Sequence, residues 1–366
     1  MKKLSWKRVI GFCGACIAFY IGAGFATMQE VMQYEASYGS RFWIVILVAA
    51  AIYIYTNLSF AGNGNKSRIE KGGEIYQVYC GKNIGKFYDY FSAFFCYMCF
   101  IVMCSSANST AAEQWGFPRG VGAAILVTAV VATALFGLDG IVNALGKLGP
   151  VIIALILLVS TISLIKSIDS LPQCMSAINS GAYDIKQVGN NNPFFSGASY
   201  GGFVILWFAS FLAEIGARND IREVNRGMIV SSVAIFSVSA LCCLSLIANI
   251  DAIWDLDVPA LALASQIHPA LSLVFAVVIF CGLYTTALPL LWTGVSKISK
   301  EGTADYKHRL FLGGIIGFAA SFLPYKTLVN VLYGLNGYLG FILIAFMIIH
   351  DIRMYISNKK NDSAYH

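Results

Sequence analysis

Charged residues are scarce in this chain of 366 residues. Only 12% of them are Asp, Glu, Lys or Arg, whereas 58% are hydrophobic and the mean hydropathy is +0.69. Soluble domains carry about a quarter charged residues. The charges cluster between apolar runs of about 20 residues, the length that spans a hydrocarbon core. The composition therefore excludes a soluble domain and predicts an all-α polytopic membrane protein.

Histidine is also scarce. The chain has four, and all lie at span ends, in loops or in the tail: His268, His308, His350 and His366. No His, Asp and Glu residues have the spacing of a metal site, and no span carries acids paired for acid–base catalysis. We therefore expect neither enzyme activity nor an organic cofactor. The ten cysteines lie mostly within spans and indicate no disulfide framework.

The apolar runs define ten predicted spans: 8–36, 39–61, 84–110, 119–137, 140–166, 197–216, 227–249, 269–296, 309–323 and 327–351. With ten spans, both termini face the same side. Of the 25 Lys and Arg residues, all but five fall on that side, the exceptions being Arg41, Arg119, Lys166, Lys186 and Lys326. This bias predicts cytoplasmic termini. The net charge of +6 thus reflects topology and requires no nucleic-acid partner.

The chain has no low-complexity linker, so we expect one transmembrane domain over residues 1–366. It divides into halves of five spans, about 8–166 and 197–351. Because five is odd, the two halves would have opposite orientations in the membrane. The outer segment 250–268 is too short and too polar to span, and we expect it to be re-entrant or to cap an opening.

The first span contains a break. In "FYIGAGFATMQE" (19–30), Gly22, Ala23 and Gly24 interrupt the helix at mid-bilayer, and Glu30 follows. A broken helix exposes N–H groups at the start of one half and carbonyls at the end of the other, so it can hold an anionic group and a cation. Alternatively, the small residues only allow close helix packing.

The first span of the second half has a matching irregularity. Ala209 and Ser210 form a small pair in the middle of 197–216, and Glu214 lies near its inner end. Interrupted helices at corresponding positions of inverted halves indicate the binding site of a transporter.

Span 269–296 carries adjacent hydroxyls at mid-bilayer. Thr285 and Thr286 follow Gly282 by about one turn, and hydroxyl and carbonyl oxygens are suitable ligands for a small hard cation. The alternative is that each threonine bonds to a carbonyl of its own helix.

Together these features resemble the LeuT fold of the amino-acid/polyamine/organocation superfamily. "IGAGFATMQE" resembles the start of bacterial permeases of the YkvI-like branch. The separation of Gly140 and Pro150 resembles a helix of sodium symporters that unwinds to release sodium inward. The resemblance implies discontinuous helices 1 and 6 and a bacterial plasma-membrane location.

The resemblance also implies one sodium site. Its ligands would be carbonyls and hydroxyls of Ala18, Ile21, Gly282, Thr285 and Thr286. Some family members hold a second sodium with an asparagine after the break, where this chain has Phe25. We therefore expect at most one sodium ion.

The substrate implied by the resemblance would lie at Gly22 and against the amides of Ala23, Gly24 and Phe25. Three further side chains are candidates: Phe208 and Ser210 from the sixth span and Tyr97 from the third. Each of these three has a packing interpretation too.

Three ionisable residues are candidates for gating or coupling: Glu30, Lys147 and Glu214. In proton-coupled relatives a lysine of the fifth span occupies the sodium position, but Lys147 could instead extend to the inner interface. Glu214 could pair with Arg218, one turn away, and Glu30 could bond to a neighbouring span or bind an amine.

The sequence thus predicts a symporter that moves a small zwitterion, an amino acid, together with a cation, sodium being favoured over protons. Alternatives are a proton-coupled or uncoupled amino-acid or amine permease and a transporter-like sensor. Its partners would be the substrate and the bilayer.

Overall fold

The computed structural model describes residues 4–20, 23–136 and 148–364. These residues form helices and no strand. The α-helices are α1 (Trp6–Tyr20), α2 (Ala23–Ala26), α3 (Gln29–Tyr34), α4 (Phe42–Ser67), α5 (Ile75–Trp115), α6 (Val121–Phe136), α8 (Leu148–Lys166), α9 (Leu171–Asn179), α10 (Pro193–Arg218), α11 (Ile221–Ala248), α12 (Ile250–Ile253), α13 (Pro259–Ile267), α14 (Pro269–Ser296), α15 (Ala304–Ala320), α16 (Tyr325–Leu328) and α17 (Gly334–Ala364). Short 3-10 turns cover Ala36–Arg41, Gly72–Glu74 and Ile168–Ser170, and a π-helical turn, Val329–Tyr333, joins α16 to α17.

Five helical stretches are long and apolar enough to cross a membrane: Ala36–Ser67, Gly72–Trp115, Ile221–Ala248, Pro269–Ser296 and Tyr325–Ser357. Two bent pairs raise the number to seven, namely Val151–Lys166 with Ile168–Asn179 and Pro193–Leu206 with Phe208–Arg218. The other predicted spans coincide with α1, α6 and α15, which are shorter or followed by a break. The described helices therefore follow the ten predicted spans, and the chain is a polytopic α-helical membrane protein.

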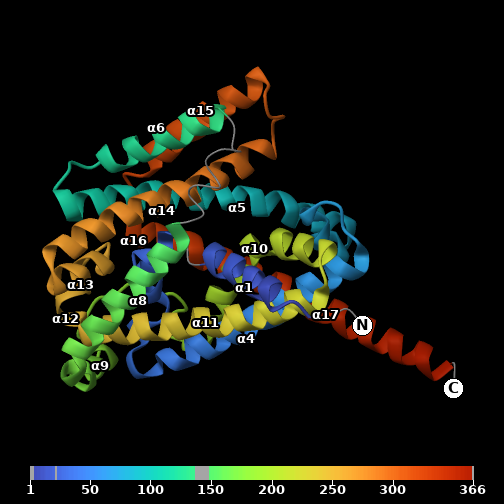
Figure 1. Ribbon diagram of the computed structural model, residues 1–366, viewed down its shortest axis with the longest axis horizontal. Coiled ribbons are helices and arrows are strands. Elements are labelled where there is room, and N and C mark those ends of the chain that lie inside the picture. The colour runs from blue at the N-terminus through green and yellow to red at the C-terminus, as the bar shows by residue number, and fades with distance from the viewer. Residues whose placement is uncertain (1–3, 21–22, 137–147, 365–366) are drawn as a thin grey trace.

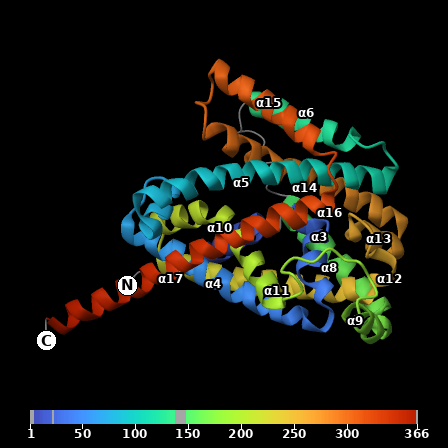
Figure 2. The same cartoon turned by 180° about the vertical axis from the view of Figure 1, so that it is seen from behind.

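The spans pack in two groups (Figure 1). The helices α1, α4, α10, α11 and α17 form one bundle, in which α10 lies against both α4 and α17 while α1 lies against α11. The long helices α5 and α14 cross beside it. Helices α6 and α15 lie side by side at the outer edge, and Figure 2 shows the same layer from behind.

Glycines bring helices of the bundle into backbone contact. A Cβ atom on Gly340 of α17 would lie 1.7 Å from the carbonyl oxygen of Gly202 on α10. A Cβ on Gly64 of α4 would lie 2.3 Å from the carbonyl oxygen of Ala213. The glycine rows of these spans are thus packing surfaces, as expected from the sequence.

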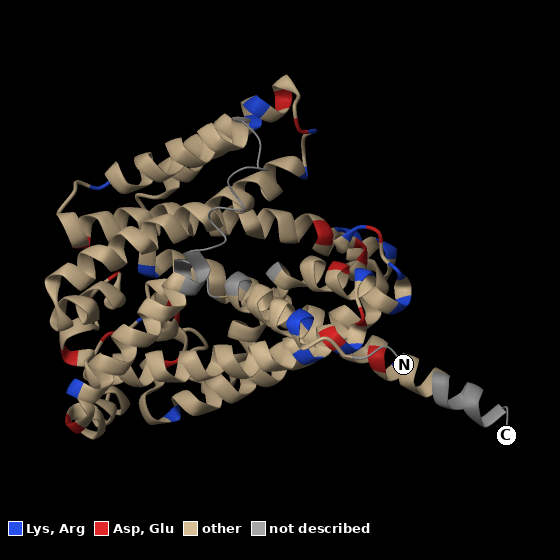
Figure 3. Ribbon diagram, viewed as in Figure 1, with Lys and Arg blue, Asp and Glu red and all other residues tan. Residues whose placement is uncertain are grey.

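Both termini lie at one end of the molecule, and the short helices α9, α12 and α13 lie at the other (Figures 1 and 2). The predicted capping segment 250–268 corresponds to α12 and α13. Charged residues gather mainly towards the ends of the helices, and the middle is largely uncharged (Figure 3). Near the terminal end, Asp220 caps α11, and hydrogen bonds from Arg222 lower the pKa of Asp220 to about 2.

Candidate functional site at the break of the first span

The first span is interrupted at Thr27 and Met28, between α2 and α3. Helix α1 ends at Tyr20, the single turn α2 covers Ala23–Ala26, and α3 begins only at Gln29. Met28, between α2 and α3, has a left-handed backbone conformation with φ 61° and ψ 6°. Residues other than glycine rarely adopt this conformation. Ile21 and Gly22 lie outside the described residues, as do the side chains of Ala18, Ala23 and Gly24.

Protein rather than lipid surrounds the chain after the break. The hydroxyls of Thr27 and Tyr325 are 2.9 Å apart, and the carbonyl of Thr27 accepts a hydrogen bond from the amide of Ala260 at 3.3 Å. Helix α14 packs against α2. Irregular backbone at membrane depth needs such partners, because lipid offers none.

An aromatic cluster surrounds Tyr20, the last residue of α1. Five rings lie with centroids 5.3–6.3 Å from that of Tyr20: Phe25, Tyr53, Tyr200, Phe208 and Phe236. The predicted substrate residues Phe25 and Phe208 are each only 1% exposed. The structure thus brings these two together through Tyr20, which the sequence analysis did not single out.

Glu30 lies just beyond the break on α3 and is 7% exposed. It makes no hydrogen bond or ion pair with the described residues. Five tyrosines are close enough to interact with its carboxylate electrostatically: Tyr20, Tyr34, Tyr200, Tyr325 and Tyr333. The hydroxyls of Tyr34, Tyr200 and Tyr333 are buried and lack a hydrogen-bond partner in the structure.

A second buried acid, Glu35, follows α3. It is fully buried, and Ser239 of α11 donates a hydrogen bond to its Oε1 at 2.6 Å, whereas its Oε2 has no partner. No Lys, Arg or His of the described residues lies within 4 Å of either acid. Glu35 falls inside the predicted span 8–36, and that position is the signal by which it could have been found.

The sixth span bends where the sequence suggests. The segments Pro193–Leu206 and Phe208–Arg218 of α10 are inclined at 57°. Phe208 faces the Tyr20 cluster, whereas Ser210 lies against the backbone of Gly72, and a Cβ on that glycine would come within 2.6 Å of the serine Cβ. Ser210 therefore lies at the loop before α5.

Glu214 lies further along α10 and is engaged with protein. Its Oε1 accepts a hydrogen bond from the amide of Gly72 at 3.0 Å, and its Oε2 is 3.6 Å from the guanidinium of Arg218. This geometry matches the ion pair between Glu214 and Arg218, which was one of the two predicted roles of Glu214.

The two threonines of α14 differ. Thr285 donates a hydrogen bond to the carbonyl of Gly282 at 2.8 Å, within its own helix. Thr286, which is half-buried, makes no hydrogen bond to the described residues. Of the two hydroxyls, only that of Thr286 is therefore uncommitted. It lies on α14, the helix that packs against α2.

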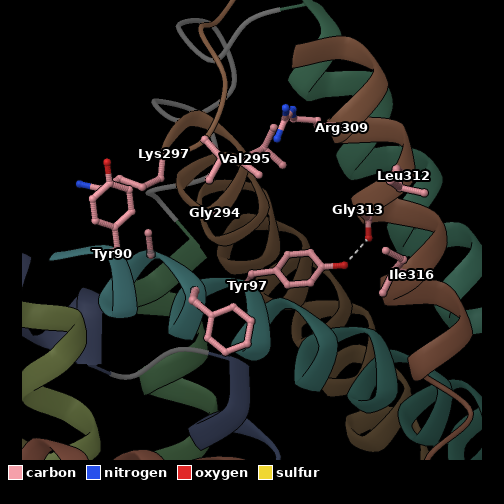
Figure 4. A pocket seen from close by; sticks show the side chains of 12 residues that line it. Tyr90, Tyr97, Gly294, Val295, Lys297, Arg309, Leu312, Gly313 and Ile316 are labelled. Atoms are coloured by element: carbon pink, nitrogen blue, oxygen red, sulfur yellow. Dashed lines mark hydrogen bonds between the residues drawn. The ribbon is translucent and has the colours of Figure 1, made fainter. Parts of the chain in front are cut away.

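Tyr97 lies apart from the other candidates. Its hydroxyl donates a hydrogen bond to the carbonyl of Gly313 on α15 at 2.9 Å, in a groove that also contains Lys297 and Arg309 (Figure 4). This contact uses the hydroxyl that the prediction assigned to the substrate. Lys147 and Gly140 fall outside the described residues.

The sequence matches no known family model and no curated protein. Several solved structures match nearly the whole chain. MhsT in complex with L-phenylalanine has a TM-score of 0.61 at 13% identity, over 95% of this chain and 90% of that one. A mutant manganese transporter of Eremococcus coleocola has a TM-score of 0.56 at 15% identity, over 94% and 79%. Mhp1, in an inward-facing conformation, has a TM-score of 0.55 at 13% identity, over 93% and 75%.

These neighbours share the LeuT fold, and the fold is common to them and to this chain. The protein is thus an all-α, multi-pass membrane protein with the LeuT fold, in which the first span is interrupted and the sixth is bent. The predicted fold class is confirmed.

Proposed function

We propose that the protein is a secondary transporter that moves a small zwitterionic substrate, an amino acid, by alternating access. The observation that carries the proposal is the buried Glu30 on α3, directly after the interruption at Thr27 and Met28 and beside the Tyr20 cluster. A neighbour with the same fold was crystallised with L-phenylalanine, which supports the choice of substrate class.

The two charges of an amino acid suit the two parts of this site. Amide groups at the start of α2, in Ala23, Gly24 and Phe25, offer partial positive charge to the carboxylate. Glu30 offers negative charge to the ammonium, and tyrosine faces also attract cations. The Glu30 carboxylate is buried, and no base of the described part of the chain lies within 4 Å of it, so a bound ammonium would supply positive charge there.

We further propose that the coupling ion is sodium, held by Thr286 with carbonyls of the first span at Ala18 and Ile21. A hydroxyl without a hydrogen-bond partner is available as a hard ligand. Thr285 and the carbonyl of Gly282, the other candidate ligands, already bond to each other and would have to share that contact with the ion.

Protons are the second candidate, and a specific observation favours them. Glu30 and Glu35 are both buried without a cationic partner among the described residues, and an ionised carboxylate in that setting is costly. Carboxyls of this kind are suited to carrying protons across a membrane. Lys147, which could replace the sodium, belongs to the same alternative.

Thermal stabilisation of the purified protein tests the proposal. A panel of amino acids and amines is added in sodium or in potassium at several pH values, to wild type, Thr286→Ala and Thr293→Ala. We expect amino acids to stabilise wild type more in sodium, and Thr286→Ala to lose this dependence. Thr293→Ala, which removes a hydroxyl from the same helix two turns away, should retain it.

Other outcomes discriminate between the alternatives. If sodium has no effect and pH shifts ligand binding instead, the protein is proton-coupled or uncoupled, and Thr286 is not a ligand. Binding without uptake into proteoliposomes would indicate a sensor. Manganese is not carried over from the Eremococcus neighbour, since that likeness concerns the fold alone.

We place the protein in the plasma membrane of a bacterium, with both termini in the cytoplasm. The excess of Lys and Arg on the side of the termini supports this orientation.

A further inference from the structure

A groove lies between α5, α14 and α15, apart from the break of the first span. Its volume is about 310 Å³, and its wall is mostly apolar, with Ala93 and Tyr97 from α5, Val295 from α14 and Leu312 and Ile316 from α15 (Figure 4). Tyr97 crosses it to bond the carbonyl of Gly313. The groove is therefore a stable feature of the contact between the inner helices and the peripheral layer.

The rim of the groove faces the bilayer. Its large apolar side chains are exposed on the surface of the protein: Phe94 is 56% exposed, Leu312 46% and Ile316 46%. In a multi-pass protein such a surface contacts lipid chains. The hydrocarbon part of a lipid can thus enter the groove from the side without crossing water.

Cationic groups mark one end of the groove. Arg309 uses its Nε to bond both carboxylate oxygens of Asp305, at 2.9 and 2.8 Å. Its two terminal nitrogens have no partner among the described residues. The pair is exposed on both sides, 42% and 54%, so it is weak. The terminal nitrogens of Arg309 can therefore donate two parallel hydrogen bonds to an anion.

Lys297 contributes in a different way. Its ammonium is 2.6 Å from Asp89 and lies over the ring of Tyr90, 4.9 Å from the centroid. This tight pair is neutral overall and holds the groove wall in place. The connection between α14 and α15 adds Lys300 and Glu301, and the first turn of α15 adds Lys307, so positive charge is in excess there.

We propose that this groove binds an anionic phospholipid, with the phosphate on Arg309 and one acyl chain along the apolar wall. Both charge and shape are matched, and basic pockets between spans on the cytoplasmic side are suited to anionic headgroups. The positive-inside bias places Arg309 on that side. The inference is independent of the proposed transport, because it uses a different site.

The experiment compares phosphatidylglycerol with phosphatidylcholine, each added to purified full-length protein in detergent. We expect phosphatidylglycerol to raise the melting temperature by about 4 °C or more above phosphatidylcholine when present at roughly 100 times its dissociation constant. Arg309→Gln should lose most of this difference. Arg353→Gln removes an exposed arginine of α17 from the same predicted side and should keep it.

Two further arms separate the parts of the proposal. Ile316→Trp fills the groove without changing charge and should reduce the number of phosphatidylglycerol molecules retained in native mass spectrometry. Glycerol phosphate, which lacks acyl chains, should not stabilise the protein. Equal effects of the two lipids, an unchanged preference in Arg309→Gln, or stabilisation by glycerol phosphate alone would each overturn the proposal. If Arg309→Gln folds poorly, lipid retention by Ile316→Trp decides.

Discussion

At the scale of single residues, the buried acids of α3 set the chemistry of the site. Among the described residues, Glu30 and Glu35 have aromatic rings, a serine and cysteines near them and no base within 4 Å. Taking a carboxylate out of water is unfavourable unless a partner replaces the water. A bound proton, metal cation or substrate ammonium would each be such a partner, and variants of Glu30 discriminate among them.

We expect Glu30→Gln to weaken amino-acid binding by about ten- to a hundredfold, since a hydrogen bond to a charged group contributes about 1.5–3 kcal/mol. The melting temperature without ligand should change little, because the amide keeps the size of the side chain. Isothermal titration measures the affinity. Glu70→Gln, in an exposed loop, serves as the control. Unchanged affinity in Glu30→Gln would remove this residue from the substrate site.

At the scale of helices, glycine contacts determine how closely the spans of the bundle approach. Besides the contact at Gly340, a Cβ on Gly202 of α10 would lie 2.1 Å from the carbonyl oxygen of Gly337 on α17. Helices in a bilayer associate through such close packing. Lipid chains are as apolar as the helix surfaces, so no hydrophobic effect drives the helices together. The contact between α10 and α17 also fixes the position of Pro193–Leu206, the first segment of the bent sixth span, which carries Tyr200.

Gly340→Ala should lower the free energy of unfolding by about 1–3 kcal/mol, because an added methyl has no space against α10. Gly62→Ala should be neutral or stabilising by up to about 1 kcal/mol, because no atom lies within 4 Å of the new methyl and alanine favours helix. Thermal unfolding of both variants in the same detergent checks the pair. Equal stability of the two would show that α10 and α17 are not as close as described.

At the scale of the whole molecule, the two ends differ in structure. One end carries the termini, and the other is covered by α9, α12 and α13 (Figures 1 and 2). Two side chains, Glu113 and Lys326, attach the segment between α12 and α13 to the rest of the protein. Glu113 accepts hydrogen bonds from the amides of Asp257 and Val258, and Lys326 donates one to the carbonyl of Asp255. These contacts fix the segment against α5, which carries Glu113, and α16, which carries Lys326.

The orientation in the membrane can be tested with fusions. Green fluorescent protein attached after the last residue should fluoresce, because it folds in the cytoplasm. Alkaline phosphatase fused after Ser180, in the predicted outer segment, should be active, because that enzyme folds outside. The opposite pattern for both fusions would invert the topology. Both fusion points on the same side of the membrane would contradict the odd number of spans, five, predicted between Ser180 and the C-terminus.

Much of the fold followed from residue pattern. The apolar runs located every span because the bilayer requires about 20 apolar residues per helix. The small pair at 209–210 lies close to the bend of the sixth span, which falls between Leu206 and Phe208. Of the predicted first break, Gly22 lies outside the described residues, and Ala23 and Gly24 belong to α2. Fewer of the site residues were accessible in this way. Phe25 and Phe208 meet at the Tyr20 cluster, but Tyr97 points to α15 and Ser210 to the loop at Gly72.

The sequence by itself determined the class of protein and the approximate positions of its helices, because both depend on local hydrophobicity. Only the tertiary structure decided which side chains share a site. Tyr20, Tyr200 and Tyr333 come from three different spans, and α10 and the π-helical turn that carries Tyr333 pack against α3, the helix of Glu30. Such long-range contacts leave no periodic pattern in any one segment.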